Sequence, residues 1–503
     1  MKSKIFFLRS VSSLFLLTAL VAIATSCKKD LDINTDPNVP GYNDASVALV
    51  LPAGELATTA KLGGDLAILG GIWSQYYTQS AVANQYKSYD AFDVKTTDVV
   101  DNSSYDILFS DGLKNYQYVI DSSKSQQNWS YYLMATVMKA YTTGILVDLY
   151  DKIPYSQALQ GTANLNPAFD DGYTIYQSLI SSIDTALGKD FTAPTNTPIT
   201  TPGYVASDLV FGGDISKWKQ FANTLKLKFY LRMVNAHPSV ASAGIISLFA
   251  AADSATFLSV DASVTNFTDV PNKDNPMYEQ NIRSLNTPDN LRASVTLASW
   301  LAQYGDTRCL KYFGDSTANA INQGDFNGTT PSYATADVFV EKPTDPVIFI
   351  SAAESAFLQS EADLRYLGAG HAKELYDTGV ARAFEAAGQA NEIDSFILPG
   401  KPYDSLYTAA PLEAIITQKW LSFPIGCHEI EGFFERNRTG FPVSSPVYST
   451  DPSYIPGEFV IGPNSVLSSG LYPKRLVYPY DETSRNTSAP ALVPITTAVW
   501  WGL

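Results

Sequence analysis

Stretches with apolar residues at helical spacing recur along the chain, and they come in neighbouring pairs. The pairs are 129–146 with 174–187, 218–233 with 239–252, 353–367 with 372–387, and 414–421 with 430–434. A helix buries an apolar stripe by packing it against another element, so each pair predicts a helical hairpin. No strict repeat period joins the pairs, yet small and aromatic residues lie at their contacts. We therefore expect a mainly α fold of about four tetratricopeptide-like helical hairpins.

Long connections rich in Pro, Asn, Thr and Tyr separate these pairs. The longest are 190–211, 256–291, 313–347 and 439–503. Loops of this length in a compact protein usually carry function. We expect the inserted loops to form the ligand face of the protein.

The N-terminus has the pattern of a targeting segment. Three basic residues precede an apolar run over 11–23, which is too short to span a bilayer, and small residues then lead to Cys27. The pattern resembles a bacterial lipoprotein signal, in which the Cys becomes the first mature residue and carries the lipid. Residues 1–26 are then the signal peptide and Cys27 is the lipid attachment site. The alternative is an ordinary secretory signal with an incidental Cys.

Composition limits what the remainder can be. With 45% hydrophobic and 17% charged residues the chain is globular, and its net charge of -16 makes nucleic acid a poor partner. Residues 27–50 are rich in Asp, Asn and Pro and predict a tether, whereas 51–503 predict a single domain. Cys309 and Cys427 could form a disulfide or remain two buried thiols, and both alternatives stay open.

One stretch, 71–92, carries a Trp, four Tyr and a Phe interleaved with Gln and Asn. A sugar ring is bound by an aromatic plane against its C–H face and by amide groups at its hydroxyl rim. The candidate ligand contacts here are Trp73, Tyr77, Gln79, Asn84 and Tyr86. The spacing of the Trp and the first two Tyr also fits the inner stripe of an ordinary helix, so the alternative is that these rings are core.

A second candidate region is the polar loop 269–290, which holds Tyr278, Arg283 and several Asn residues. It could contact a ligand or a partner protein, or it could be a solvated connection. We include both residues among the candidate ligand contacts.

The placement of the carboxylates distinguishes a sugar-binding protein from a glycosidase, because a glycosidase needs two carboxylates in a cleft. Glu429, Glu431 and Glu435 form the best cluster, but the first two face different sides of a helix. We interpret the cluster as part of an ion-pair network with Glu354, Glu361 and Arg365. The three His residues have no spacing typical of a metal site, so no catalytic residue, metal or cofactor is expected.

Several segments share a family resemblance: CKKDLDINTDPN, WKQFANTLKLKFYLRM (218–233), AAESAFLQSEADLRYLG (352–368), IITQKWLSFPIGCHEIEGFFERNRTGFP (415–442), RLVYPYDETSRN (475–486) and the closing VWWGL. Together they resemble the SusD/RagB family of Bacteroidetes outer-membrane lipoproteins, and more closely its second, SusD-like branch. The likeness covers most of the chain.

The resemblance implies four tetratricopeptide-like hairpins that brace a SusC-type TonB-dependent transporter, with a loop-built face that captures a nutrient. Such proteins are not enzymes, and their ligands are most often glycans, with peptides also known. We therefore expect a lipid-anchored outer-membrane protein, facing the cell exterior, that binds an oligosaccharide and delivers it to the transporter. The rivals are a lipoprotein glycosidase or peptidase, and a structural transporter subunit with no ligand of its own.

Overall fold

The structure is a computed structural model of the chain. The residues that it describes are 45–196, 207–251, 256–328, 335–468 and 470–503. Cys27, the signal peptide and most of the predicted tether lie outside these ranges. The chain divides into two units, 1–49 and 50–503, and the fold below is that of the second unit. Among the described residues, no helix is long and apolar enough to cross a membrane.

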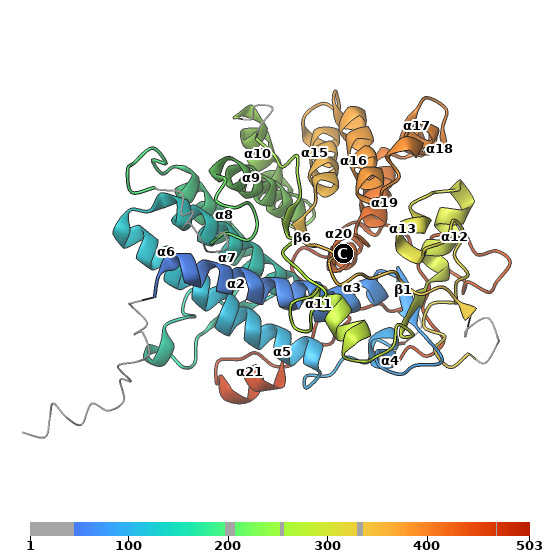
Figure 1. The fold of residues 1–503 in the computed structure, drawn as a ribbon, viewed down its shortest axis with the longest axis horizontal. Coiled ribbons are helices and arrows are strands. Elements are labelled where there is room, and N and C mark those ends of the chain that lie inside the picture. Colours follow the sequence, from blue (N-terminus) through green and yellow to red (C-terminus); the bar gives the residue numbers. More distant parts are fainter. Residues whose placement is uncertain (1–44, 197–206, 252–255, 329–334, 469) are drawn as a thin grey trace, which may run out of the picture. The chain divides into compact units, whose positions relative to one another are not determined.

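The N-terminal half of the described chain is mainly helical. Its α-helices are α2 (Val47–Lys61), α3 (Ala67–Trp73), α4 (Lys87–Asp90), α5 (Val99–Ile107), α6 (Lys114–Gln126), α7 (Trp129–Tyr150), α8 (Gly172–Leu187), α9 (Ile215–Arg232) and α10 (Pro238–Ala250). From α6 to α10 each helix packs against the next (Figure 1). The predicted hairpins α7–α8 and α9–α10 are confirmed, and α6 is an additional partner of α7. Asp171 and Asp214 cap α8 and α9 by accepting from backbone N–H groups of the first turn.

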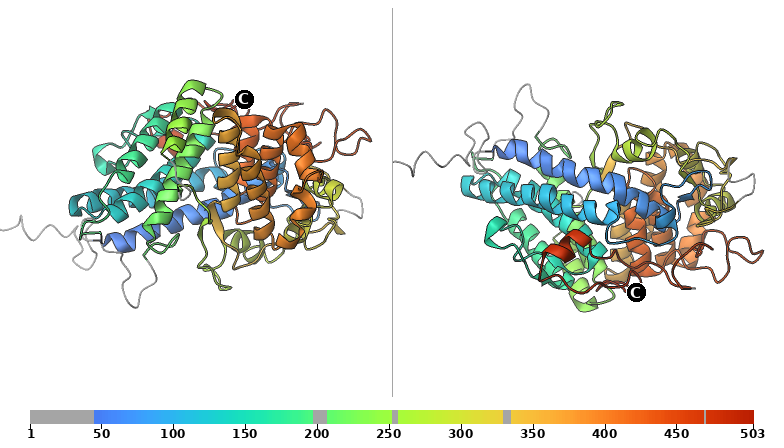
Figure 2. Two further views of the ribbon diagram at one scale, coloured as in Figure 1. Left: turned by 90° about the horizontal axis from the view of Figure 1, so that it is seen from above. Right: turned by 90° about the horizontal axis from the view of Figure 1, so that it is seen from below.

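The row of hairpins continues in the C-terminal half (Figure 2). Its helices are α15 (Ala352–Tyr366), α16 (Ala372–Ala386), α17 (Asp394–Ile397), α18 (Pro402–Ala409), α19 (Pro411–Ser422), α20 (Ile430–Thr439) and α21 (Tyr480–Arg485). The predicted hairpin α15–α16 is confirmed. The fourth hairpin differs from the prediction, because α19 follows α18 after the single residue Ala410 and packs against it, whereas α20 packs against α3 as well as α19.

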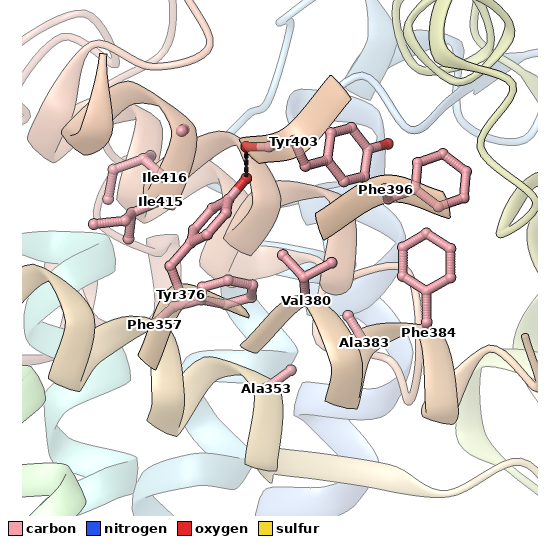
Figure 3. Close-up of a cluster of buried hydrophobic side chains, with 11 residues drawn as sticks. Ala353, Phe357, Tyr376, Val380, Ala383, Phe384, Phe396, Tyr403, Ile415 and Ile416 are labelled. Carbon is pink, nitrogen blue, oxygen red and sulfur yellow. Dashed lines mark hydrogen bonds between the residues drawn. The ribbon is translucent and has the colours of Figure 1, made fainter. Parts of the chain in front are cut away.

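Aromatic and aliphatic side chains fill the space between α15, α16, α18 and α19 (Figure 3). Phe357 and Tyr376 are fully buried, with ring centroids 6.3 Å apart. The Tyr376 hydroxyl donates to the backbone oxygen of Tyr403 at 3.2 Å, so its one polar group is satisfied inside the core. The cluster packs these helices against one another in one contiguous apolar core.

Short strands and irregular helices connect the hairpins. The strands are β1 (Tyr77–Gln79), β2 (Ile153–Pro154), β3 (Phe169–Asp170), β4 (Ala262–Val264), β5 (Leu291–Ala293) and β6 (Val347–Ile350), paired antiparallel as β1–β5, β2–β3 and β4–β6. The remaining helices are α11 (Pro276–Tyr278), α12 (Val295–Tyr304), α13 (Cys309–Phe313), the π-helices η1 (Leu62–Leu66), η2 (Leu108–Leu113) and η4 (Glu279–Arg283), and the 3₁₀ turns η3 (Gly161–Ala163) and η5 (Ala390–Glu392). Cys309 and Cys427 are free and buried, so the two-thiol alternative is the correct one.

A buried network of ion pairs joins several hairpins. Arg232 on α9 bonds Glu431 on α20 at 2.7 Å and also pairs with Glu435, and its Nε lies 3.3 Å from Asp148 on α7. Each of these side chains is less than 5% exposed. Burial alone would raise the pKa of Glu431, but the charges of Lys228 and Arg232 outweigh it and hold the pKa at about 2.

The network extends to α15 and α19. Arg438 bonds both Glu361 and Glu435 at 2.6 Å, and Lys419 lies 3.3 Å from Glu435 and 3.8 Å from Glu354. The predicted ion-pair network is therefore confirmed for Glu431 and Glu435, whereas Glu429 forms no ion pair with the described residues. The charges of the network are compensated inside the protein, where an unpaired charge would be very costly.

Removing one member of this network should destabilise the whole unit. In Arg438→Met the side-chain volume is nearly kept, but Glu361 and Glu435 each lose one of their guanidinium partners, and we expect a loss of about 3–5 kcal/mol. Chemical unfolding measures the effect. The control Lys124→Met changes an exposed Lys of α6 and should leave the midpoint unchanged. A loss below about 1 kcal/mol for Arg438→Met would contradict the role given to the network.

The contact between α3 and α20 depends on a missing side chain. A Cβ at Gly70 would lie 2.4 Å from the backbone N and Cα of Ile430, so a larger residue forces the two helices apart. We expect Gly70→Ala to cost about 1–3 kcal/mol by overpacking, or to prevent folding. At Gly370 an added Cβ meets nothing within 4 Å, so Gly370→Ala is the matched control in the same thermal unfolding experiment. Equal midpoints for the two variants would show that the close contact is wrong.

Candidate functional site

The aromatic stretch 71–92 lies mostly in the interior. Trp73 has no exposed surface, donates its indole N–H to the backbone oxygen of Tyr89 at 3.0 Å, and packs on Phe433 at a centroid distance of 4.9 Å. Tyr77 is equally buried, and its hydroxyl donates to the oxygen of Ala67 at 3.0 Å. Both rings are covered by protein, which corrects the expectation that they present open faces to a ligand.

The local backbone differs from a continuous helix. α3 ends at Trp73, Gln75 adopts a left-handed φ of 58°, and the chain enters β1 at Tyr77. The aromatic spacing therefore marks core residues, but on a helix end and a strand. The side-chain amide and hydroxyl groups of this stretch, which were candidate ligand contacts, mostly form hydrogen bonds to the backbone that stabilise the turn.

Gln79 and Tyr86 are also internal. The side-chain oxygen of Gln79 accepts from the backbone N–H of Tyr86 at 2.6 Å, and Tyr86 stacks on Tyr89 with centroids 5.8 Å apart. The Tyr86 hydroxyl has no hydrogen-bond partner among the described residues. Asn84 alone of the five candidates in this stretch is exposed. The other four therefore form the support of a loop whose surface carries Asn84.

The second candidate region is tied to the first. Ser80 donates its backbone N–H to the oxygen of Asn290 at 2.7 Å, next to the β1–β5 pair. Within this region Arg283 bonds Asp269 and Asp274, both at 2.5 Å, and its guanidinium lies 5.4 Å from the Tyr278 ring centroid. Tyr278 and Arg283 are partly exposed. The structure thus brings these two candidates together, but Arg283 serves chiefly to close its own loop.

A hollow with a volume of about 230 Å³ lies elsewhere, between α5 with η2, the loop after β2, and α21. Its walls are formed by Asn102, Tyr105, Asp106, Phe109, Pro154, Ala158, Leu159, Leu165, Pro167, Pro479, Asp481, Glu482, Arg485 and Asn486. None of the sequence candidates is among them. The wall combines aromatic and aliphatic surface with amide and carboxylate groups, which is the usual make-up of a site for a polar organic ligand.

Side-chain amides hold the three segments together. Asn102 on α5 donates to the Asp481 carboxylate at 2.7 Å and accepts from the Asp481 backbone N–H at 3.1 Å. Asn486 donates to the backbone oxygen of Pro167 at 2.9 Å and to Glu482 at 2.8 Å. These contacts fix α21 against both of the other walls, so the hollow is preformed.

The floor of the hollow is aromatic. The rings of Tyr105 and Phe109 lie at a centroid distance of 4.7 Å, and Tyr105 also meets Tyr150 edge-on at 5.2 Å. The Tyr105 side chain is 5% exposed, and within the described part of the chain its hydroxyl has no hydrogen-bond partner. Burial, and then the charge of Glu482, raise the pKa of this hydroxyl well above its ordinary value, so it stays a neutral donor. A buried donor without a partner is costly, so an acceptor that came within reach of this hydroxyl would be favoured.

The loop wall shows backbone strain. Leu159 has a φ of 63°, in the left-handed region that a branched side chain rarely adopts. Strain of this kind persists where the surroundings enforce it, and it is typical of binding sites. This wall could not be predicted from the sequence, because Leu159 and its neighbours carry no recognisable motif. The one available signal was the long loop 439–503, which contains α21 and was expected to carry function.

The carboxylates considered for catalysis lie outside the hollow. Glu431 and Glu435 are at most 2% exposed and are neutralised by the ion-pair network. Glu429 is 1% exposed, and burial raises its pKa to about 8, which keeps it largely uncharged at pH 7. The described residues also contain no group of three or more His, Cys, Asp or Glu arranged to hold a metal ion.

Known proteins resemble the chain along most of its length. A model of the SusD-like type, described as starch-binding associating with outer membrane, matches residues 68–457. A solved SusD/RagB family protein from Bacteroides thetaiotaomicron is 20% identical with a TM-score of 0.70, covering 91% of this chain and 99% of that one. A SusD homolog from Bacteroides uniformis is 22% identical with a TM-score of 0.68, covering 91% and 100%. A chitin-binding SusD homolog from Flavobacterium johnsoniae is 18% identical with a TM-score of 0.66, covering 90% and 98%.

No curated protein matches the chain. At these identities the solved structures establish the fold alone, and they agree with the hairpins described above. The family model covers well over half of the chain, which confirms the resemblance noted in the sequence. The chain belongs to the SusD-like family described as starch-binding and associating with the outer membrane.

Proposed function

We propose that this protein is a lipid-anchored surface protein that binds an oligosaccharide and delivers it to a SusC-type TonB-dependent transporter in the outer membrane. Membership of a family described as starch-binding supports a glycan ligand, and so does the likeness to a chitin-binding homolog. The basic and apolar N-terminal residues that lead to Cys27 support the lipid anchor. The protein acts by equilibrium binding, without chemistry on its ligand.

The observation that carries the proposal is the hollow at α21. A sugar can place its C–H face on the ring of Tyr105 or Phe109 and its hydroxyl groups near Asn102, Asn486 and the carboxylates of α21. The unpartnered hydroxyl of Tyr105 gains an acceptor when a sugar oxygen occupies the hollow.

A volume of about 230 Å³ holds one or two sugar rings, so a longer chain extends outside. Stacking and a few hydrogen bonds in a site of this size give an affinity of roughly micromolar to millimolar. Such an affinity suits a protein that must release its ligand to a transporter.

The accessible residues among the sequence candidates are a separate part of the proposal. Asn84 lies on the loop after β1, and Tyr278 and Arg283 lie on α11 and η4, in the segment that Asn290 joins to β1. We propose these three residues as outer contacts for a longer ligand or for the partner protein. Trp73, Tyr77, Gln79 and Tyr86 support these loops from inside.

The hydroxyl of Tyr105 provides a clean test of the site. Tyr105→Phe removes an oxygen that bonds no described residue, so thermal stability should not fall, whereas affinity should drop about 3- to 10-fold through one lost hydrogen bond. Titration calorimetry with maltooligosaccharides and chitooligosaccharides measures the affinity. Tyr86→Phe removes another unpartnered hydroxyl, beneath the Asn84 loop, and is the matched control.

Each outcome of this experiment has a distinct meaning. If Asn84→Ala and Tyr86→Phe lower the affinity while Tyr105→Phe does not, the ligand binds at the loops joined by Asn290. Sustained release of shortened oligosaccharides in molar excess over the protein would show that the protein is a glycosidase and would contradict the binding-only proposal. Absence of binding to glycans and to peptides would favour a structural transporter subunit.

Anchoring is tested at Cys27. The wild-type protein expressed in its bacterial host should incorporate labelled palmitate, sediment with the outer membrane and co-purify with a large β-barrel transporter. Cys27→Ser should lose the label and the membrane association, because without its lipid the chain has only weak contacts with the membrane surface. Unchanged labelling in the variant would show that another residue carries the lipid.

A further inference from the structure

The hollow at α21 carries an excess of negative charge, and this bears on the charge of its ligand. Four charged residues line it, namely Asp106 on α5 and Asp481, Glu482 and Arg485 on α21. The loop after β2 contributes apolar and backbone surface only to the lining. Three carboxylates therefore face one guanidinium.

Arg485 neutralises only one of these carboxylates. Its guanidinium lies 3.0 Å from Asp481, which also accepts from Asn102 at 2.7 Å. The Arg485 side chain is 78% exposed, so solvent screens its charge strongly. Arg485 is therefore paired with Asp481, and Asp106 and Glu482 have no cationic partner in the lining.

Glu482 is the acid best placed to meet a ligand. It is partly buried, and Asn486 donates to one of its oxygens at 2.8 Å. Its other oxygen accepts no hydrogen bond from the described residues, and Glu482 lines the same hollow as Tyr105. Burial raises the pKa of this carboxyl and the Asn486 hydrogen bond opposes the rise; a cation beside the carboxyl would stabilise its ionised form.

We propose that the hollow discriminates among sugars by charge, and that it prefers a sugar with a protonated amine over a neutral sugar and a neutral sugar over a uronic acid or sulfated sugar. This inference rests on the proposed function and deepens it by naming the ligand class of that site. The carboxylates of Glu482 and Asp106 attract the amine and repel an anion across the hollow. The net charge of the whole chain, -16, acts in the same direction at longer range.

The test compares three oligosaccharides of equal length by titration calorimetry at pH 6 and low salt. These are glucosamine, N-acetylglucosamine and galacturonic acid oligomers, which are cationic, neutral and anionic. The glucosamine oligomer should bind about 3- to 10-fold more tightly than the acetylated one, and the galacturonate oligomer at least about 3-fold more weakly. Raising the salt concentration should narrow these differences, because the charges lie near solvent.

Two variants with opposite charge changes sharpen the test. Glu482→Gln keeps an acceptor for Asn486 and should reduce the amine preference several-fold, measured as the ratio of the affinities for the glucosamine and N-acetylglucosamine oligomers. Arg485→Gln removes the one cation of the lining and should increase the preference. Unfolding midpoints of both variants show whether the fold is intact.

The outcomes separate this inference from the function on which it rests. Binding of none of the three oligomers would overturn the proposed function itself. Binding of all three with equal affinity, or with the galacturonate oligomer tightest, would overturn the charge preference and leave glycan binding standing. A preference for the amine that survives Glu482→Gln unchanged would place the discrimination outside the hollow.

Discussion

The ion pairs around Arg232 and Arg438 determine how the helical hairpins are arranged. A buried charge is tolerated only when its partner is held in the correct place, so these pairs are strongly directional contacts. They connect α7, α9, α15, α19 and α20, which belong to different hairpins. The apolar core described between α15 and α19 supplies cohesion, but it would allow some sliding of one hairpin against the next. The charges fix the relative position of the helices, and the helices in turn fix the loops.

The hollow at α21 depends on this rigidity. Its walls come from segments that are distant in sequence, and only a few amide hydrogen bonds connect them directly. Tyr105, at its floor, packs on Tyr150 at the end of α7, the same helix that carries Asp148 of the network. The binding surface is therefore attached to the most constrained part of the fold. A ligand meets a site that is already formed, which reduces the entropy cost of binding.

The hairpins could be predicted from the sequence, and the site could not. Helical periodicity is a local signal, so α7, α8, α9, α10, α15 and α16 follow from it, as does the ion-pair character of Glu431 and Glu435. Trp73 and Tyr77 were misjudged because Tyr and Gln suit a buried turn as well as a sugar-binding surface. The hollow escaped notice because Tyr105, Leu159 and Glu482 become neighbours only through the fold.

A long-range contact of the C-terminal segment bears on the rate at which the protein folds. The indole N–H of Trp501 donates to Asp148 at 2.7 Å, and these residues are separated by 353 positions in the chain. Trp501 also lies 5.0 Å from the guanidinium of Arg232, so it completes the surroundings of the network. A contact between residues so far apart in the sequence forms only after a very large loop of chain has closed. Non-local contacts of this kind slow the search for the native state, so we expect the docking of Trp501 to be a late folding step that seals the charged interior from water.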